Sequence, residues 1–149
     1  MKKKIISLPP NYFFFCIILS AVLFFIFPEM NKIKSPYNLL GLILMGLGLY
    51  LVGKSWYLFK EKRTPESFEQ STYLVTEHLY KYSRHPMYLG GVVFLFGLSI
   101  LLGNLYSFAS PIIFFLFINY MFIPFEEEKN EKTFGQEFLD YKKRVRRWL

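Results

Sequence analysis

Four long apolar runs, separated by short polar segments, dominate the chain. They cover residues 12–27, 39–59, 87–102 and 105–125, and only the second contains a charged residue, Lys54. A helix needs ~20 apolar residues, within a range of about 17–25, to cross the hydrocarbon core of a bilayer. The pattern therefore predicts an all-α, polytopic membrane protein with about four transmembrane helices, built as a single membrane domain over residues 1–149.

Individual runs carry further features. The first is short, equal in length to the third, and follows three lysines, a combination that also occurs in secretory signal peptides. No small-residue cleavage motif follows it, which favours a retained membrane anchor. The second run contains Gly41, Gly46, Gly48 and Gly53, which permit close contact with another helix. Asn119 in the fourth run is a candidate for interhelical hydrogen bonds.

Two local patterns predict a turn and a final helix. Gly103-Asn104 between the last two runs predicts a tight turn, so these helices should be antiparallel neighbours. After the fourth run, apolar residues recur at intervals of four and three positions, which places them on one helical face. These residues are Phe134, Phe138, Tyr141, Val145 and Trp148. Lysines and arginines surround them, so we expect a C-terminal amphipathic helix that lies on an anionic membrane surface or packs on the protein.

Charge is unevenly distributed between the polar segments. The formal net charge is +7, and 15 of the 18 Lys and Arg residues fall in the N-terminus, the segment 60–85 and the tail 126–149. With four spans these three segments share one side of the membrane, whereas the other side carries only Lys32 and Lys34. Because loops rich in Lys and Arg stay in the cytoplasm, both termini are predicted to be cytoplasmic. No nucleic-acid partner is expected, since the apolar runs leave little surface for one.

Neither a disulfide nor a metal site is predicted. Cys16 is the single cysteine, and with only His78 and His85 the chain falls short of the four ligands of a structural zinc site. The content of hydrophobic (53%) and aromatic (21%) residues excludes a disordered chain.

Polar residues gather directly before the third run and directly after the fourth. The first group includes Tyr80, Arg84 and His85, and the second is the acidic triplet at 126–128. The predicted hairpin brings both groups to one membrane face. Pro86 favours a helix start, and the free N–H groups of a helix N-terminus can bind an anion. Taken singly, these residues also fit topology-setting charges, an interfacial aromatic belt and a solvated helix end.

Two motifs extend these groups. The first is Leu74-Val75-Thr76, then Tyr80, Arg84-His85-Pro86, Tyr88 and Gly90. The second is Glu126-Glu127, then Phe134-Gly135, Phe138, Tyr141 and Val145. In this order and spacing they resemble the signature of the isoprenylcysteine carboxyl methyltransferase and phospholipid methyltransferase superfamily. The resemblance covers residues 72–148, about half of the chain.

The resemblance implies an integral-membrane methyltransferase that uses S-adenosylmethionine and acts on a lipid-like or amphiphilic acceptor. Its cofactor site would lie at the cytoplasmic ends of the last two spans and the tail. The cofactor-binding residues carried over by position are Leu74, Val75, Tyr80, His85, Pro86, Met87, Tyr88, Glu126 and Glu127. His85 and the helix N-terminus suit the cofactor's carboxylate, Glu126 suits its ammonium or ribose hydroxyls, and tyrosine faces suit its sulfonium. The catalytic residue and the oligomeric state stay unassigned.

Two departures from the family pattern stand out, and Pro124 adds a prediction about the fourth helix. His78 occupies a position where the family usually has glycine, and the stretch 122–125 lacks the Arg that often precedes the Glu pair. That Arg is implicated at the substrate of the carboxyl methyltransferases, so the acceptor stays open between an isoprenylcysteine carboxylate and a phospholipid amine. Pro124 predicts a bend or an end of the fourth helix. An NADPH-dependent membrane reductase of similar architecture and a non-catalytic membrane scaffold remain alternatives.

Overall fold

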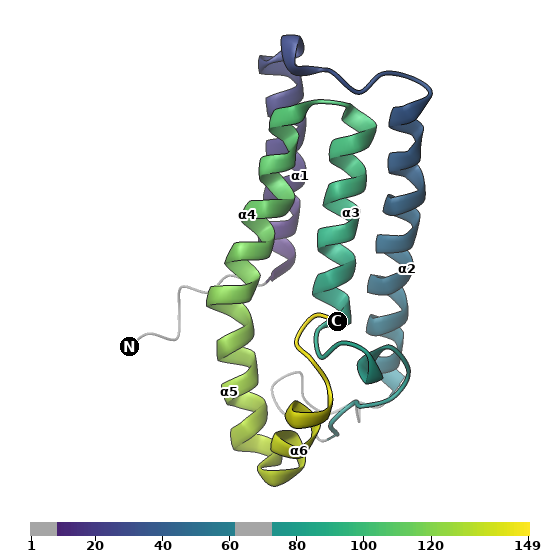
Figure 1. Ribbon diagram of the computed structural model, residues 1–149. Coiled ribbons are helices and arrows are strands. Elements are labelled where there is room, and N and C mark those ends of the chain that lie inside the picture. Colours follow the sequence, from purple (N-terminus) through teal and green to yellow (C-terminus); the bar gives the residue numbers. More distant parts are fainter. Residues whose placement is uncertain (1–8, 62–72) are drawn as a thin grey trace.

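The computed structural model describes residues 9–61 and 73–149, which form a bundle of helices (Figure 1). The α-helices are α1 (Pro9–Ile26), α2 (Leu40–Glu61), α3 (Pro86–Leu102), α4 (Ala109–Phe117), α5 (Ile123–Phe134) and α6 (Gln136–Arg144). The shorter elements are the 3-10 helices η1 (Pro28–Met30), η2 (Tyr37–Leu39), η3 (His78–Lys81) and η4 (Leu105–Phe108), and the π-helical turn η5 (Ile118–Phe122). The predicted all-α class is confirmed for the described residues.

Each apolar run forms a helix close to its expected bounds. Two helices, Tyr37–Leu58 and Leu105–Phe134, are long and apolar enough to cross a membrane. Pro10–Ile26 and Pro86–Leu102 are shorter apolar helices. The N-terminal lysines and Thr72, where the family resemblance begins, lie outside the described residues.

The fourth helix continues beyond the apolar run. α4, η5 and α5 follow one another without interruption, so the helix does not end at Pro124, and that part of the expectation is wrong. Pro124 lies in the first turn of α5, directly after the π-helical turn. A proline is tolerated where its missing N–H leaves no bond unmade, and a wider turn can remove the clash with the preceding carbonyl.

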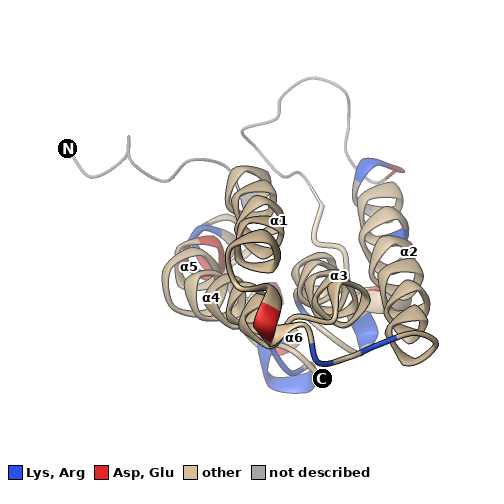
Figure 2. Ribbon diagram, turned by 90° about the horizontal axis from the view of Figure 1, so that it is seen from above, with Lys and Arg blue, Asp and Glu red and all other residues tan. Residues whose placement is uncertain are grey.

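α3 lies at the centre of the bundle, with α2 on one side and α1 and α4 on the other (Figure 2). Two glycine pairs, Gly41 with Gly97 and Gly48 with Gly90, lie where α2 and α3 pack. A Cβ atom at Gly48 would lie 2.6 Å from the carbonyl oxygen of Gly90, so the two backbones are in direct contact. Small residues thus set the distance between these helices, as is usual for helix pairs in membranes.

The turn between α3 and η4 forms at Gly103-Asn104, as predicted. Gly103 has a φ of 71°, a left-handed conformation that commonly ends a helix. Asn104 is fully buried, and its Nδ2 donates to the carbonyl of Phe27 at 2.8 Å. Its Oδ1 accepts from the N–H of Tyr106 at 2.9 Å, which caps η4. The turn therefore fixes α3 and α4 as antiparallel neighbours and ties them to the end of α1.

The C-terminal helix is shorter than the sequence predicts. α6 spans nine residues, because Gly135 adopts a φ of 54° between α5 and α6 and Val145 is extended. Phe138 and Tyr141 on α6 are buried within the protein. The expectation that Phe134 through Trp148 share one helical face is therefore wrong. The sequence left open whether the apolar face of this segment lies on the membrane or on the protein. In the structure, the apolar face of α6 packs on the protein.

Candidate functional site

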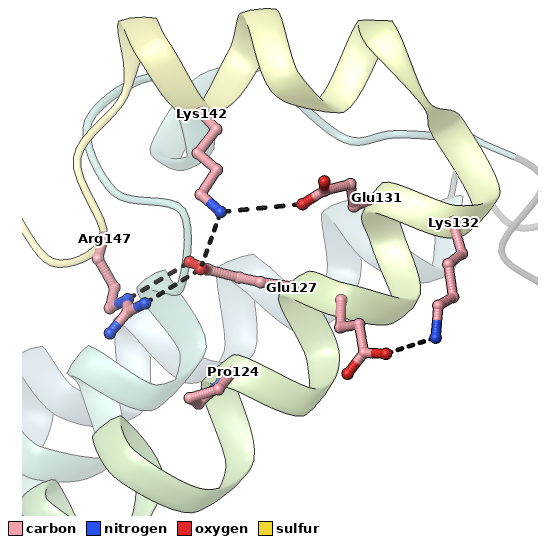
Figure 3. A pocket seen from close by; sticks show the side chains of 7 residues that line it. Pro124, Glu127, Glu131, Lys132, Lys142 and Arg147 are labelled. Atoms are coloured by element: carbon pink, nitrogen blue, oxygen red, sulfur yellow. Dashed lines mark hydrogen bonds and ion pairs between the residues drawn. The ribbon is translucent and has the colours of Figure 1, made fainter.

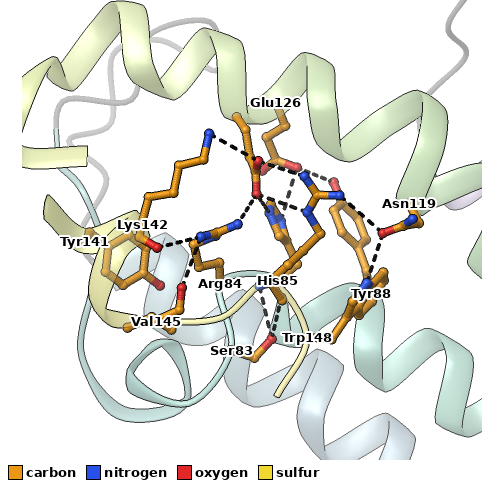
Figure 4. Close-up of polar contacts among 12 residues, drawn as sticks. Ser83, Arg84, His85, Tyr88, Asn119, Glu126, Tyr141, Lys142, Val145 and Trp148 are labelled. Carbon is orange, nitrogen blue, oxygen red and sulfur yellow. Dashed lines mark hydrogen bonds and ion pairs between the residues drawn. The ribbon is translucent and has the colours of Figure 1, made fainter. Parts of the chain in front are cut away.

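The first turn of α3 meets the first turn of α5 at one end of the bundle (Figure 4). The hydroxyl of Tyr88 donates a hydrogen bond to Glu126 Oε2 at 2.9 Å. The ring of His85 stacks on that of Tyr88 with 5.8 Å between the centroids, and its Nδ1 lies 3.8 Å from Glu126 Oε2. The hairpin thus brings the two polar groups together, as predicted from their positions in the sequence.

Tyr80 joins this group from η3. Burial, the negative charge of Glu126 and the neighbouring Tyr141 hold the pKa of Tyr80 above its usual range, so its phenol stays protonated. The hydroxyl of Tyr141 donates to the backbone carbonyl of Tyr80 at 2.7 Å. Burial also raises the pKa of Tyr141, against the opposing charge of Arg84. Tyr80 therefore offers a protonated hydroxyl on a backbone that α6 holds in place.

The other predicted residues surround this centre in different ways. Pro86 is fully buried in the first turn of α3, and Met87 follows it half-buried. No side chain of the described residues caps that turn, so its first N–H groups remain for a ligand or solvent. Leu74 and Val75 are 8% and 7% exposed. Leu74 packs against Phe138 and Tyr141 in a separate small core, so the structure does not place its side chain beside Glu126.

Glu127 occupies a different environment from Glu126. The side chain of Glu127 is 5% exposed, whereas that of Glu126 is 35% exposed. Arg84 Nη2 lies 2.8 Å from Glu127 Oε1, and Arg147 Nη2 lies 3.0 Å from Oε2. His85 Nε2 lies 3.4 Å from Oε1. Protein groups therefore use the hydrogen-bonding capacity of Glu127, while Glu126 keeps acceptor sites open to a ligand.

The end of the chain packs against Arg84. The Nη1 atom of Arg84 donates to the carbonyls of Lys142 and Val145, both at 3.0 Å. Its backbone N–H donates to the carbonyl of Arg146, also at 3.0 Å. The segment before α3 and the tail after α6 are therefore joined through backbone carbonyls and a charged side chain. Hydrogen bonds to a charged group contribute more than neutral ones, typically about 1.5–3 kcal/mol.

The backbone of His78 accounts for one departure from the family pattern. His78 has a φ of 53°, in the left-handed region that glycine adopts freely and other residues adopt at an energetic cost. Histidine is among the residues enriched there, and this side chain is exposed, as expected for a surface position. A glycine, which the family resemblance leads us to expect here, would adopt this backbone freely, whereas His78 adopts it with some strain.

A polar hollow of about 410 Å³ lies between α5, α6 and the tail (Figure 3). It is lined by Pro124, Glu127, Glu128, Glu131, Lys132, Lys142 and Arg147. Among the described residues predicted to bind the cofactor, only Glu127 contributes to its wall. Lys142 Nζ lies 3.8 Å from Glu127 Oε2 and 4.0 Å from Glu131 Oε2. These lining charges pair with one another, so the contact between Tyr88 and Glu126 remains the better candidate for a ligand site.

Three residues that hold the site together are absent from the predicted set. They are Arg84, Asn119 and Arg147. Arg84 lies inside the first motif and fits a topology-setting charge equally well, and Arg147 is one of several cations in the tail. Asn119 gave the clearest signal, because an amide within an apolar run needs a partner. Which partner it finds depends on the fold of the tail, which the sequence pattern mispredicts.

Comparison with known proteins identifies the family. The family model described as phospholipid methyltransferase matches residues 37–137. The chain belongs to this family. The match contains α2, α3, the continuous helix formed by α4, η5 and α5, and the beginning of α6. It therefore includes all the predicted cofactor-binding residues.

Two named methyltransferases are similar to most of this chain. The protein-S-isoprenylcysteine O-methyltransferase of Schizosaccharomyces pombe is 32% identical over 127 residues, covering 78% of this chain and 50% of that protein. Protein-S-isoprenylcysteine O-methyltransferase B of Arabidopsis thaliana is 31% identical over 109 residues, covering 72% of this chain and 52% of that protein. This family member thus spans about half the length of these two relatives.

A solved structure has the same fold. The eukaryotic intramembrane Ras methyltransferase ICMT (isoprenylcysteine carboxyl methyltransferase) superposes with a TM-score of 0.75 at 26% identity. The match covers 97% of this chain and 54% of that one. The bundle described here therefore corresponds to about half of the larger protein.

Proposed function

We propose that the protein is an integral-membrane methyltransferase that transfers a methyl group from S-adenosylmethionine to a lipid-like or amphiphilic acceptor. The observation that carries this proposal is the contact between Tyr88 and Glu126, at 2.9 Å, which assembles both family motifs into one site. Family membership and the likeness to isoprenylcysteine methyltransferases support the reaction type.

The residues present fit S-adenosylmethionine. Glu126 has a partly open carboxylate for an ammonium or for ribose hydroxyls. The first turn of α3 lacks a side-chain cap and suits a carboxylate. The tyrosine rings at positions 80 and 88 offer π faces to a sulfonium or an adenine. When bound, the cofactor supplies an electrophilic methyl group.

The protein contributes mainly position and exclusion of water. Methyl transfer is an in-line displacement, so its rate depends on holding the acceptor atom and the methyl group in line. Tyr88 is fixed by Glu126 on one side and by the stacked ring of His85 on the other. Phe122 contacts Tyr88 edge-on, with 6.0 Å between the ring centroids. An acceptor carboxylate needs no base in such a site, whereas an ammonium must first lose a proton.

The membrane part of the fourth helix supports an acceptor that arrives from the bilayer. Met121 and Phe125 are 55% and 48% exposed on either side of Phe122. An amphiphile could lay its apolar part along this face and present its head group at Tyr88. An isoprenylcysteine and a phospholipid both meet that description.

We further propose four membrane spans, formed by α1, α2, α3 and residues 105–125, with both termini and the site in the cytoplasm. The charge bias between the two ends of the bundle supports this orientation. In a Cys16→Ser background, Lys34→Cys should react with a membrane-impermeant maleimide in intact cells. Lys129→Cys should react only after permeabilisation. The reverse labelling pattern would contradict the orientation.

Loss of the Glu126 charge should selectively weaken cofactor binding. Glu126→Gln removes one charge-assisted contact, for which about 1.5–3 kcal/mol is typical, so affinity for S-adenosylhomocysteine should fall roughly tenfold or more. Calorimetric titration of the detergent-solubilised protein measures the change. Glu128→Gln is the matched control, because Glu128, two positions further along α5, is 63% exposed and pairs only with Lys132 among the described residues. Equal affinities of the two variants would rule out Glu126 as a cofactor ligand.

A further inference from the structure

Asn119 is a polar residue within the apolar part of the fourth helix. It lies in the π-helical turn η5, between Ile118, which is fully buried, and Tyr120, which is 71% exposed. An amide in such a segment is costly unless it finds hydrogen-bond partners. A π-helical turn is also costly and occurs frequently at functional sites. The coincidence of both features at one position calls for a reason beyond packing.

The partners of Asn119 come from the last residues of the chain (Figure 4). Trp148 Nε1 donates to Asn119 Oδ1 at 3.0 Å, and Arg147 Nη1 donates to the same oxygen at 3.4 Å. The ring of Trp148 also packs on Phe115, one turn earlier, with 4.9 Å between the centroids. The tail therefore returns to the membrane part of the fourth helix and is held there by one amide oxygen.

Arg147 connects this anchor to the site. Its Nη2 lies 3.0 Å from Glu127 Oε2, so a single guanidinium bridges Asn119 in η5 and Glu127 in α5, which belong to one continuous helix. Glu127 in turn contacts Arg84 and His85 at the start of α3. Ser83 Oγ donates to the carbonyl of Arg147 at 3.1 Å, which adds a second link between the tail and the same segment.

We propose that Asn119 is a positioning residue for the cofactor site, acting through the tail residues Arg147 and Trp148. This inference rests on the proposed function. The tail fixes the rotation of α5 relative to the π-helical turn. The hydroxyl of Tyr88 and Glu126 Oε2 are 2.9 Å apart, so a rotation of α5 about its axis would carry Glu126 out of hydrogen-bonding distance. Among the described residues, no hydrogen bond joins Asn119 to Tyr88 or Glu126, so its effect on the site passes through Arg147 and Trp148.

The two tryptophans of the chain allow a test that does not depend on activity. In a Trp56→Phe background, the emission of Trp148 reports directly on the tail. Asn119→Leu should shift this emission and weaken binding of S-adenosylhomocysteine roughly tenfold. Asn119→Asp keeps the acceptor oxygen and should restore both. Tyr120→Leu, at the neighbouring exposed position, is the matched control and should leave emission and affinity unchanged.

A second variant covers the case in which Asn119→Leu does not fold. Trp148→Phe keeps the ring on Phe115 but removes the N–H donor, and should weaken binding in the same direction. If Asn119→Leu shifts the Trp148 emission but binds S-adenosylhomocysteine as tightly as the parent, Asn119 only anchors the tail and the positioning role is overturned. Unchanged emission in Asn119→Leu would overturn the anchor as well. If the parent itself fails to bind S-adenosylhomocysteine, the proposed function is wrong, and the emission still decides whether Asn119 holds the tail.

Discussion

Alanine at Gly48 should strongly destabilise the protein, whereas alanine at Gly46 should stabilise it slightly. The new Cβ at position 48 would lie 2.6 Å from both the Gly90 carbonyl oxygen and the Phe94 backbone nitrogen. Backbone atoms cannot move aside as a flexible side chain can, so α2 and α3 would have to separate. Overpacking of this kind costs about 1–3 kcal/mol and occasionally more. A Cβ at Gly46 meets nothing within 4 Å, so the gain in helix propensity, about 1 kcal/mol, remains.

Thermal unfolding in detergent measures both changes, and the sign of each shift is the informative quantity. Both positions lie on α2, two residues apart, so general effects of alanine in this helix are shared. A midpoint that rises in both variants would show that α2 and α3 are not in backbone contact. The pair Gly90 and Gly97 on α3 should behave like Gly48, since each faces backbone atoms of α2 at less than 3 Å.

Removing the charge of Glu127 should have the other large effect on stability. Glu127→Gln keeps the size of the side chain but leaves Arg84, whose side chain is 9% exposed, without its carboxylate partner. Breaking a buried ion pair by removing one partner typically costs about 3–5 kcal/mol. Arg147 and His85 lose the same partner, so the tail and the start of α3 should loosen together.

Two measurements separate this effect from a general one. The unfolding midpoint in detergent should fall in Glu127→Gln, and limited proteolysis should cleave the tail after α6 faster than in the parent. Glu128→Gln, which removes one exposed ion pair with Lys132, should leave the unfolding midpoint nearly unchanged, because exposed pairs contribute little. Equal midpoints for the two variants would mean that the contacts around Glu127 do not hold the tail.

Most of the fold follows from the chain's apolar pattern. The runs are long and almost uninterruptedly apolar, and Gly103-Asn104 predicts a tight turn, so the antiparallel arrangement of α3 and α4 is determined locally. The packing of α2 on α3 is harder to predict from the sequence. Gly41 and Gly48 indicate a close contact, but their partners Gly90 and Gly97 lie on another helix, and no local pattern pairs them.

The candidate site is predictable where it depends on that hairpin. His85, Tyr88 and Glu126 come together because they flank the two ends of the turn-linked helices. The role of Glu127 is not visible in the sequence, since two adjacent glutamates on a helix point about 100° apart and only the fold decides which one is buried. The tail is mispredicted for a related reason. Its spacing suits a long helix. Gly135 interrupts that helix with a left-handed backbone, and the tail carbonyls of Val145 and Arg146 accept hydrogen bonds from Arg84.

The proposed function requires that the site formed by Tyr88 and Glu126 binds S-adenosylmethionine. The most direct test is calorimetric titration of the detergent-solubilised protein with S-adenosylhomocysteine, repeated with NADPH as a competing ligand. We expect saturable binding of S-adenosylhomocysteine that NADPH does not displace. Binding of NADPH instead would assign the site to a reductase. Binding of neither ligand to folded protein would contradict the methyltransferase proposal and favour a membrane scaffold that retains the family fold.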